Sequence, residues 1–167
     1  MPPTATIPPP PVEQQATGVK RLAFVAVGCV FVGVAYVGAG GRVVGVIPEF
    51  LAAKEIAFAE ATELHVVATM HQRKAIMADR ADAVAVLPGG YGTMDELFEI
   101  LTWAQLGLHA KPVVLLNVKG FFDPLLAWAD HLAREGFVQR RHRELLLVAD
   151  DVGELFEALA RRGPDVR

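Results

Sequence analysis

A glycine-rich turn that runs into an acidic helix is the part of this sequence best suited to chemistry. It spans residues 87–96 and reads LPGGYGTMDE, with glycine at positions 89, 90 and 92. Glycines tolerate φ > 0 and let backbone N–H groups approach a ligand without interference from a Cβ. From Met94 onward apolar residues recur at helical spacing, so the turn leads to a helix N-terminus, where free N–H groups favour an anion. We therefore expect an anion-binding cradle with a carboxylate, Glu96, beside it.

Spacing alone leaves two interpretations of that carboxylate open. Thr93 is a candidate N-cap, and Glu96 three residues later would complete a capping box. Alternatively, the carboxylate faces the ligand and takes part in its chemistry. Neither of the common nucleotide fingerprints, GxGxxG and GxxxxGK[ST], is present, so the glycine turn alone does not decide between them.

Two adjacent cations, Arg73 and Lys74, follow Met70 closely in a second expected helix. Cations in a first helical turn oppose the helix dipole unless something anionic offsets them. An anionic ligand at the strand ends would do so, and ordinary solvent exposure is the alternative. We expect neither a metal nor a cofactor, because the histidines show no metal-ligand spacing; they are His65, His71, His109, His131 and His142.

Apolar runs alternate with helical patterns through the middle of the chain, which predicts the elements that position these residues. Expected strands cover residues 43–47, 63–67, 83–87, 113–116 and 145–148, and expected helices cover 50–61, 70–81, 94–106, 122–135 and 152–162. This order predicts an α/β fold, a Rossmann-like three-layer sandwich with a mainly parallel sheet. Ligands bind such sheets at the carboxyl ends of the strands. Pro88–Thr93 and the residues after Ile47 and Val67 fall at that edge.

Length and charge restrict the class of protein. The 167 residues suit one domain, which we place at residues 19–167 after a disordered, proline-rich tail at residues 1–18. The net charge of −3 argues against a nucleic-acid partner. The single cysteine, Cys29, cannot form an intrachain disulfide, and this is compatible with the cytoplasm, where we expect the protein.

The stretch Leu22–Gly41 contains no charged residue, and its length qualifies it as a candidate membrane span. Its glycines divide it into strand-sized pieces such as Leu22–Val27 and Val30–Val37. We expect two buried strands, or one strand and an irregular connection, rather than a span. A membrane association remains the alternative at this point.

Three stretches of the sequence carry a resemblance to a known family. Residues 70–74 read MHQRK, residues 88–96 read PGGYGTMDE, and residues 101–107 read LTWAQLG. Together they resemble the Lonely Guy family, the cytokinin riboside 5′-monophosphate phosphoribohydrolases long mislabelled as lysine decarboxylases. The resemblance continues from Arg42 to Phe137 and so covers more than half of the chain. Motifs of the form MHxRK and PGGxGTxxE at this separation are more specific than the glycines alone.

The resemblance implies an enzyme that hydrolyses the N-glycosidic bond of a nucleoside 5′-monophosphate, such as AMP or an N6-modified AMP. It implies that Arg73 and Glu96 are the catalytic pair and that the protein is a homodimer. It also implies substrate-binding roles for residues along the motifs, namely Glu55, Lys74, Gly89, Gly90, Tyr91, Gly92, Thr93, Asp95 and Thr102.

The chain departs from the family before Arg42, where the family's first βαβα unit and its glycine-rich loops are not recognisable. Two alternatives to the enzyme therefore remain. One is a phosphorylated-ligand binding protein of the same fold, similar to molybdenum-cofactor carriers, and the other is an inactive, truncated paralogue.

Overall fold

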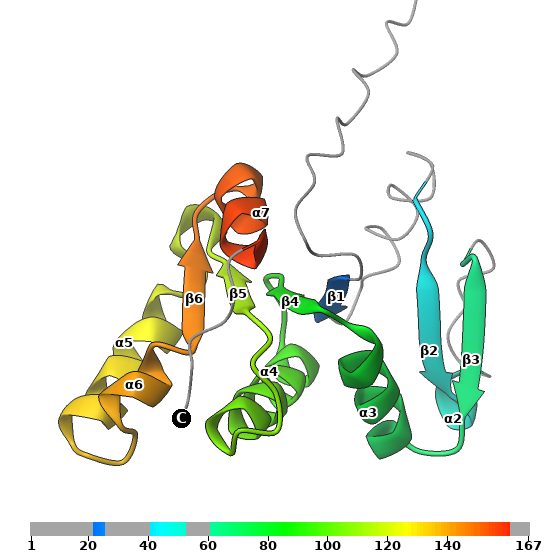
Figure 1. Cartoon of the computed structure of the whole chain (residues 1–167), viewed down its shortest axis with the longest axis horizontal. Helices are drawn as coiled ribbons and strands as arrows, with labels where there is room; N and C mark the ends of the chain where they lie inside the picture. The colour runs from blue at the N-terminus through cyan, green and yellow to red at the C-terminus, as the bar shows by residue number, and fades with distance from the viewer. Residues whose placement is uncertain (1–21, 26–40, 53–60, 161–167) are drawn as a thin grey trace, which may run out of the picture.

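The structure, a computed structural model, describes residues 22–25, 41–52 and 61–160 (Figure 1). The strands are β1 (Leu22–Val25), β2 (Val44–Pro48), β3 (Glu63–Val67), β4 (Ala83–Val86), β5 (Val113–Leu116) and β6 (Leu146–Ala149). The helices are α2 (Glu49–Ala52), α3 (Met70–Arg80), α4 (Tyr91–Gln105), α5 (Asp123–Arg134), α6 (Arg140–Arg143) and α7 (Val152–Ala160), with a 3-10 turn at Val118–Gly120. Strands and helices alternate as expected, which confirms the α/β class.

Every strand pair in the described residues is parallel, but the strands form two sheets rather than one. A four-stranded sheet has the order β1-β4-β5-β6, and β2 pairs with β3 in a two-stranded sheet. In the larger sheet Val84 lies opposite Val113, and Val113 lies opposite Leu146. Helix α3 contacts both β1 and β2 and so lies between the two sheets in contact with each (Figure 1).

The two central strands of the larger sheet are buried on both faces. All four residues of β4 and all four of β5 are buried, as their unbroken apolar runs predict. On one face Val84 and Leu115 pack with Leu97 of α4, and on the other Ala85 and Val114 pack with α7. This arrangement confirms the predicted layers of helix, sheet and helix.

Most element boundaries agree with the sequence pattern, and the differences have local causes. The strands at residues 63–67 and 113–116 begin and end where predicted. Gly136 follows α5 with φ of +82°, a backbone conformation that favours glycine at a helix C-terminus. The short α6 was not predicted, because RRHR contains no apolar periodicity.

The uncharged stretch at residues 22–41 is described only in part. Leu22–Val25 forms β1 and pairs with β4, which confirms the first expected strand there. The second expected strand, Val30–Val37, and the expected tail at residues 1–18 lie outside the described residues. Among the helices of the described ranges, none has both the length and the apolar character needed to cross a membrane.

Candidate active site

The glycine turn joins β4 to α4 at the carboxyl edge of the sheet, as expected, but the helix begins earlier than predicted. Its first residue is Tyr91 rather than Met94, and Gly90 is the N-cap with φ of −99° and ψ of −149°. The Gly90 carbonyl accepts the first helical hydrogen bond, from the Met94 N–H at 3.1 Å. Of the two interpretations left open, the one in which Thr93 caps the helix and Glu96 completes a capping box is therefore wrong. Thr93 lies in the first turn of α4 and Glu96 in the second.

Glycine is needed in this turn for close packing and not for a left-handed backbone conformation. Among the described glycines, positive φ occurs at Gly107, Gly120 and Gly136 but at no glycine of this turn. A Cβ added at Gly89 would lie 2.1 Å from Thr93 Oγ1, whereas one at Gly90 would meet nothing within 4 Å. The turn can therefore close tightly on α4, and the first N–H groups of the helix, which have no partner within it, face the loop.

Arg73 and Glu96, the predicted catalytic pair, are in direct contact. Arg73 Nη1 lies 2.5 Å from Glu96 Oε1, and the two side chains are only 19% and 7% exposed. The Arg73 Nε–H also donates to the Val46 carbonyl of β2 at 3.1 Å. One guanidinium thus joins α3, α4 and β2, three elements that are distant in sequence.

Glu96 presents one oxygen to Arg73 and keeps the other free. Its Oε2 is buried and has no hydrogen-bond partner in the part of the chain that the structure describes. Burial raises the pKa of the Glu96 carboxyl, and the Arg73 charge and hydrogen bond oppose that shift without cancelling it. A buried carboxylate with a raised pKa and a free lone pair is suited to accept a proton.

Two carboxylates of α4 compensate the positive charge of Lys74. The sequence alone did not predict this pairing. Its Nζ lies 2.9 Å from Asp95 Oδ2 and 2.8 Å from Glu99 Oε2. The ion pair with Glu99, followed by the hydrogen bond with Asp95, raises the pKa of Lys74 despite its burial. The charges that compensate Arg73 and Lys74 thus come from the protein itself. Glu99 was missed, although it follows Glu96 by three residues and so shares a face of α4.

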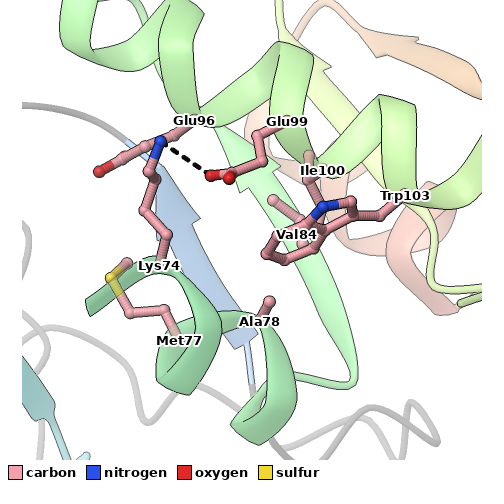
Figure 2. A pocket seen from close by; sticks show the side chains of 8 residues that line it. All are labelled: Lys74, Met77, Ala78, Val84, Glu96, Glu99, Ile100 and Trp103. Carbon is pink, nitrogen blue, oxygen red and sulfur yellow. Dashed lines mark ion pairs between the residues drawn. The ribbon is translucent and has the colours of Figure 1, made fainter. Parts of the chain in front are cut away.

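A small cavity lies between α3 and α4, beside this charge cluster. Its volume is about 30 Å³, and its lining residues are Lys74, Met77, Ala78, Val84, Glu96, Glu99, Ile100 and Trp103 (Figure 2). That is room for one or two water molecules. An open groove adjoins it and shares Lys74, Glu99 and Trp103, with further lining from Asp95, Phe98 and Thr102.

The remaining predicted substrate residues differ in their surroundings. The Tyr91 side chain is 96% exposed beside the glycine turn, and Thr93 is fully buried. The Thr102 hydroxyl donates to the Phe98 carbonyl at 2.7 Å while lining the open groove. Glu55 lies outside the described residues.

The relatives that resemble this chain share one enzyme name, and the family model that matches it carries another description. A family model described as "Possible lysine decarboxylase" matches residues 28–159, so the similarity extends upstream of Arg42. A cytokinin riboside 5′-monophosphate phosphoribohydrolase of Rhodococcoides fascians is 54% identical over 114 residues, which cover 68% of this chain and 58% of that protein. One of Arabidopsis thaliana is 49% identical over 126 residues, covering 75% and 59%.

A third relative, named a probable enzyme of the same kind, comes from Oryza sativa subsp. japonica. It is 49% identical over 125 residues, which cover 75% of this chain and 55% of the relative. The chain therefore spans little more than half the length of the curated relatives that it matches. On this similarity, which extends over most of its described residues, the chain belongs to the Lonely Guy family, whose model still carries the description of a possible lysine decarboxylase.

Proposed function

We propose that this chain hydrolyses the N-glycosidic bond of a nucleoside 5′-monophosphate and releases the free base and ribose 5-phosphate. The observation that carries the proposal is the largely buried Arg73–Glu96 pair, which leaves Glu96 Oε2 without a partner among the described residues, beside the cavity between α3 and α4. The names of the relatives, cytokinin riboside 5′-monophosphate phosphoribohydrolases, support AMP or an N6-modified AMP as the substrate class.

Glu96 acts on the water and on the sugar. The bond from C1′ to the base nitrogen breaks with its electron pair going to the base, and the sugar develops oxocarbenium character that a carboxylate stabilises. The oxygen of a water molecule bonds to C1′, and Glu96 accepts the proton that this water loses. The departing base takes up a proton from solvent. Arg73 orients Glu96 by binding Oε1, so that Oε2 is the oxygen that faces the reaction.

The turn after β4 receives the 5′-phosphate in this proposal. The N–H groups of Tyr91, Gly92 and Thr93 open α4 and have no partner within it, which suits a phosphate at a helix N-terminus. The bare Cα of Gly90 leaves open space beside them. The protein supplies the whole site in this scheme, with no cofactor and no metal.

The proposal is tested by incubating the protein with AMP and with an N6-substituted AMP and measuring base release by chromatography. Wild type should release the base. Glu96→Gln should lower kcat by about 10²- to 10⁴-fold, the usual contribution of a general base, and Arg73→Ala should lower it strongly because Glu96 loses its orientation.

Glu63→Gln is a matched control, because Glu63 forms an ion pair with Arg80 at the opposite end of α3, away from the site. No base release by wild type, or unchanged release by Glu96→Gln, would contradict the proposal. Binding of a nucleotide without turnover would instead favour the carrier-like alternative.

We also propose that the protein is a homodimer located in the cytoplasm. Support for the dimer comes from exposed apolar side chains on and near α4 and α5, including Phe98, Leu106, Leu108 and Trp128. Phe98 and Trp128 contact each other edge to face, with ring centroids 5.7 Å apart, and so form a continuous aromatic surface across the two helices.

A further inference from the structure

Neither the family motif nor the proposed chemistry assigns a role to the carboxylate of Glu99. Glu99 is the last of the three acidic residues of α4, after Asp95 and Glu96, and its side chain is only 22% exposed. Its Oε2 lies 2.8 Å from Lys74 Nζ, the ion pair drawn in Figure 2. Glu96, Lys74 and Glu99 all line the same cavity.

Lys74 is thus a cation close to a general base that needs a free lone pair. Glu96 Oε2 has no hydrogen-bond partner among the described residues, and the Lys74 charge acts on the Glu96 carboxyl. An unrestrained ammonium would find in Glu96 Oε2 a buried, unsatisfied acceptor, and buried charges are costly until paired. An ion pair there would occupy the oxygen that has to accept a proton from water.

We propose that Glu99 is a positioning residue that holds the Lys74 ammonium away from Glu96 and so keeps Glu96 Oε2 free for the hydrolysis. The proposal deepens the proposed function and rests on it. Asp95 also binds Lys74, but its side chain is 60% exposed. Solvent screens exposed ion pairs, so Asp95 alone restrains Lys74 weakly.

Within the part of the chain that the structure describes, the charged groups around Glu96 come from two helices. Helix α3 contributes Arg73 and Lys74, and α4 contributes Asp95 and Glu99. His71 of α3 also lies near Glu99, with Nδ1 3.9 Å from Glu99 Oε1, but its side chain is 78% exposed. The cavity lining from β4 is Val84, which carries no charge.

The experiment measures the pKa of Glu96 directly and kcat in parallel. Protein labelled with ¹³C at glutamate carboxyls is titrated by NMR, and Glu96 is assigned by comparison with Glu96→Gln. In Glu99→Gln the released ammonium should pair with Glu96 and lower its pKa by about one unit. The same change should lower kcat by about tenfold or more, because the base is occupied.

Adding Lys74→Met to Glu99→Gln removes the competing cation and should reverse the shift, returning the Glu96 pKa at least to its wild-type value. Glu63→Gln is the matched control, because it removes an ion pair that anchors the other end of α3, and it should change neither quantity. A Glu96 pKa that is unaffected by Glu99→Gln, or lowered equally without Lys74, would overturn the proposal.

The two readouts also separate this proposal from the proposed function. If wild type releases no base, the hydrolase proposal fails, yet the titration still shows whether Glu99 keeps Lys74 from Glu96. If wild type is active and the titration shows no dependence on Lys74, the positioning proposal alone fails. A purely structural role for Glu99 would lower the unfolding temperature without moving the pKa of Glu96.

Discussion

Glu96 holds its charge in surroundings that favour the uncharged form. Its side chain is 7% exposed, and burial outweighs the opposing effect of Arg73, so the pKa of Glu96 lies above its usual value of 4.5. A proton acceptor works best when its pKa is near the working pH, so the same burial that costs stability suits the residue to catalysis. A carboxylate that only capped a helix would be exposed and would not show this shift.

The raised pKa predicts how stability depends on pH. Because the folded pKa of Glu96 exceeds the unfolded value, its stabilising contribution is complete below pH 4.5 and is lost as the pH rises through the folded pKa. Wild type should therefore gain stability relative to Glu96→Gln as the pH falls from 7 toward 4.5, by about 1.4 kcal/mol for each unit of pKa shift.

Thermal unfolding of the two proteins across this pH range measures the difference. Effects of other titrating groups are common to both proteins and cancel in the comparison. A difference in unfolding temperature that stays constant with pH would show that burial does not raise the pKa of Glu96.

At the scale of elements, the first turn of α4 depends on close contact between Gly89 and Thr93. Thr93 is fully buried, and its Oγ1 is unpaired among the described residues, so its main role here is packing against the glycine. The contact fixes the angle at which the chain leaves β4 and enters α4. That angle determines where the free N–H groups of the helix point.

Gly89→Ala should therefore destabilise the protein by about 1–3 kcal/mol, the usual cost of overpacking. Its Cβ would lie 2.1 Å from Thr93 Oγ1 and must displace the helix or the turn. Gly90→Ala, which meets nothing within 4 Å, should cost only the loss of a favourable N-cap, about 0.5–1 kcal/mol. Chemical denaturation measures both values, and equal costs at the two positions would contradict this account.

The sequence was informative where one element determines its own boundaries. Buried strands such as Val113–Leu116 are apolar throughout and are bounded by proline or polar residues, so their ends were predictable. The start of α4 was misplaced because Tyr91 and Gly92 are poor helix formers, and only the hydrogen bond from the Met94 N–H to the Gly90 carbonyl shows that they lie in the helix. The ion pair of Glu99 could not be predicted, because its partner, Lys74, lies on another helix. Pairing between Arg73 and Glu96 came from the family resemblance rather than from spacing.

At the scale of the whole molecule, apolar side chains remain uncovered on the face formed by α4 and α5. Trp128 is 47% exposed and Leu108 is 70% exposed. Exposed aromatic and aliphatic groups of this kind are enriched in the cores of subunit interfaces. The proposed homodimer would cover them.

Sedimentation or light scattering should accordingly give twice the mass of the chain. Trp128→Lys would place a charge in the interface and should shift the protein toward the monomer. Val66→Lys, at an equally exposed apolar position on β3, should leave the dimer intact. A dimer that tolerates Trp128→Lys would show that the interface lies elsewhere.

The guanidinium of Arg73 also joins the smaller sheet to α4. Through one side chain the Val46 carbonyl of that sheet is connected to Glu96, the proposed general base. Loss of activity in Arg73→Ala would therefore have two causes. Glu96 loses its partner, and β2 and β3 lose a contact that attaches them to α4. Loss of activity in Glu96→Gln leaves the bond to Val46 in place, which makes it the cleaner measure of the chemistry.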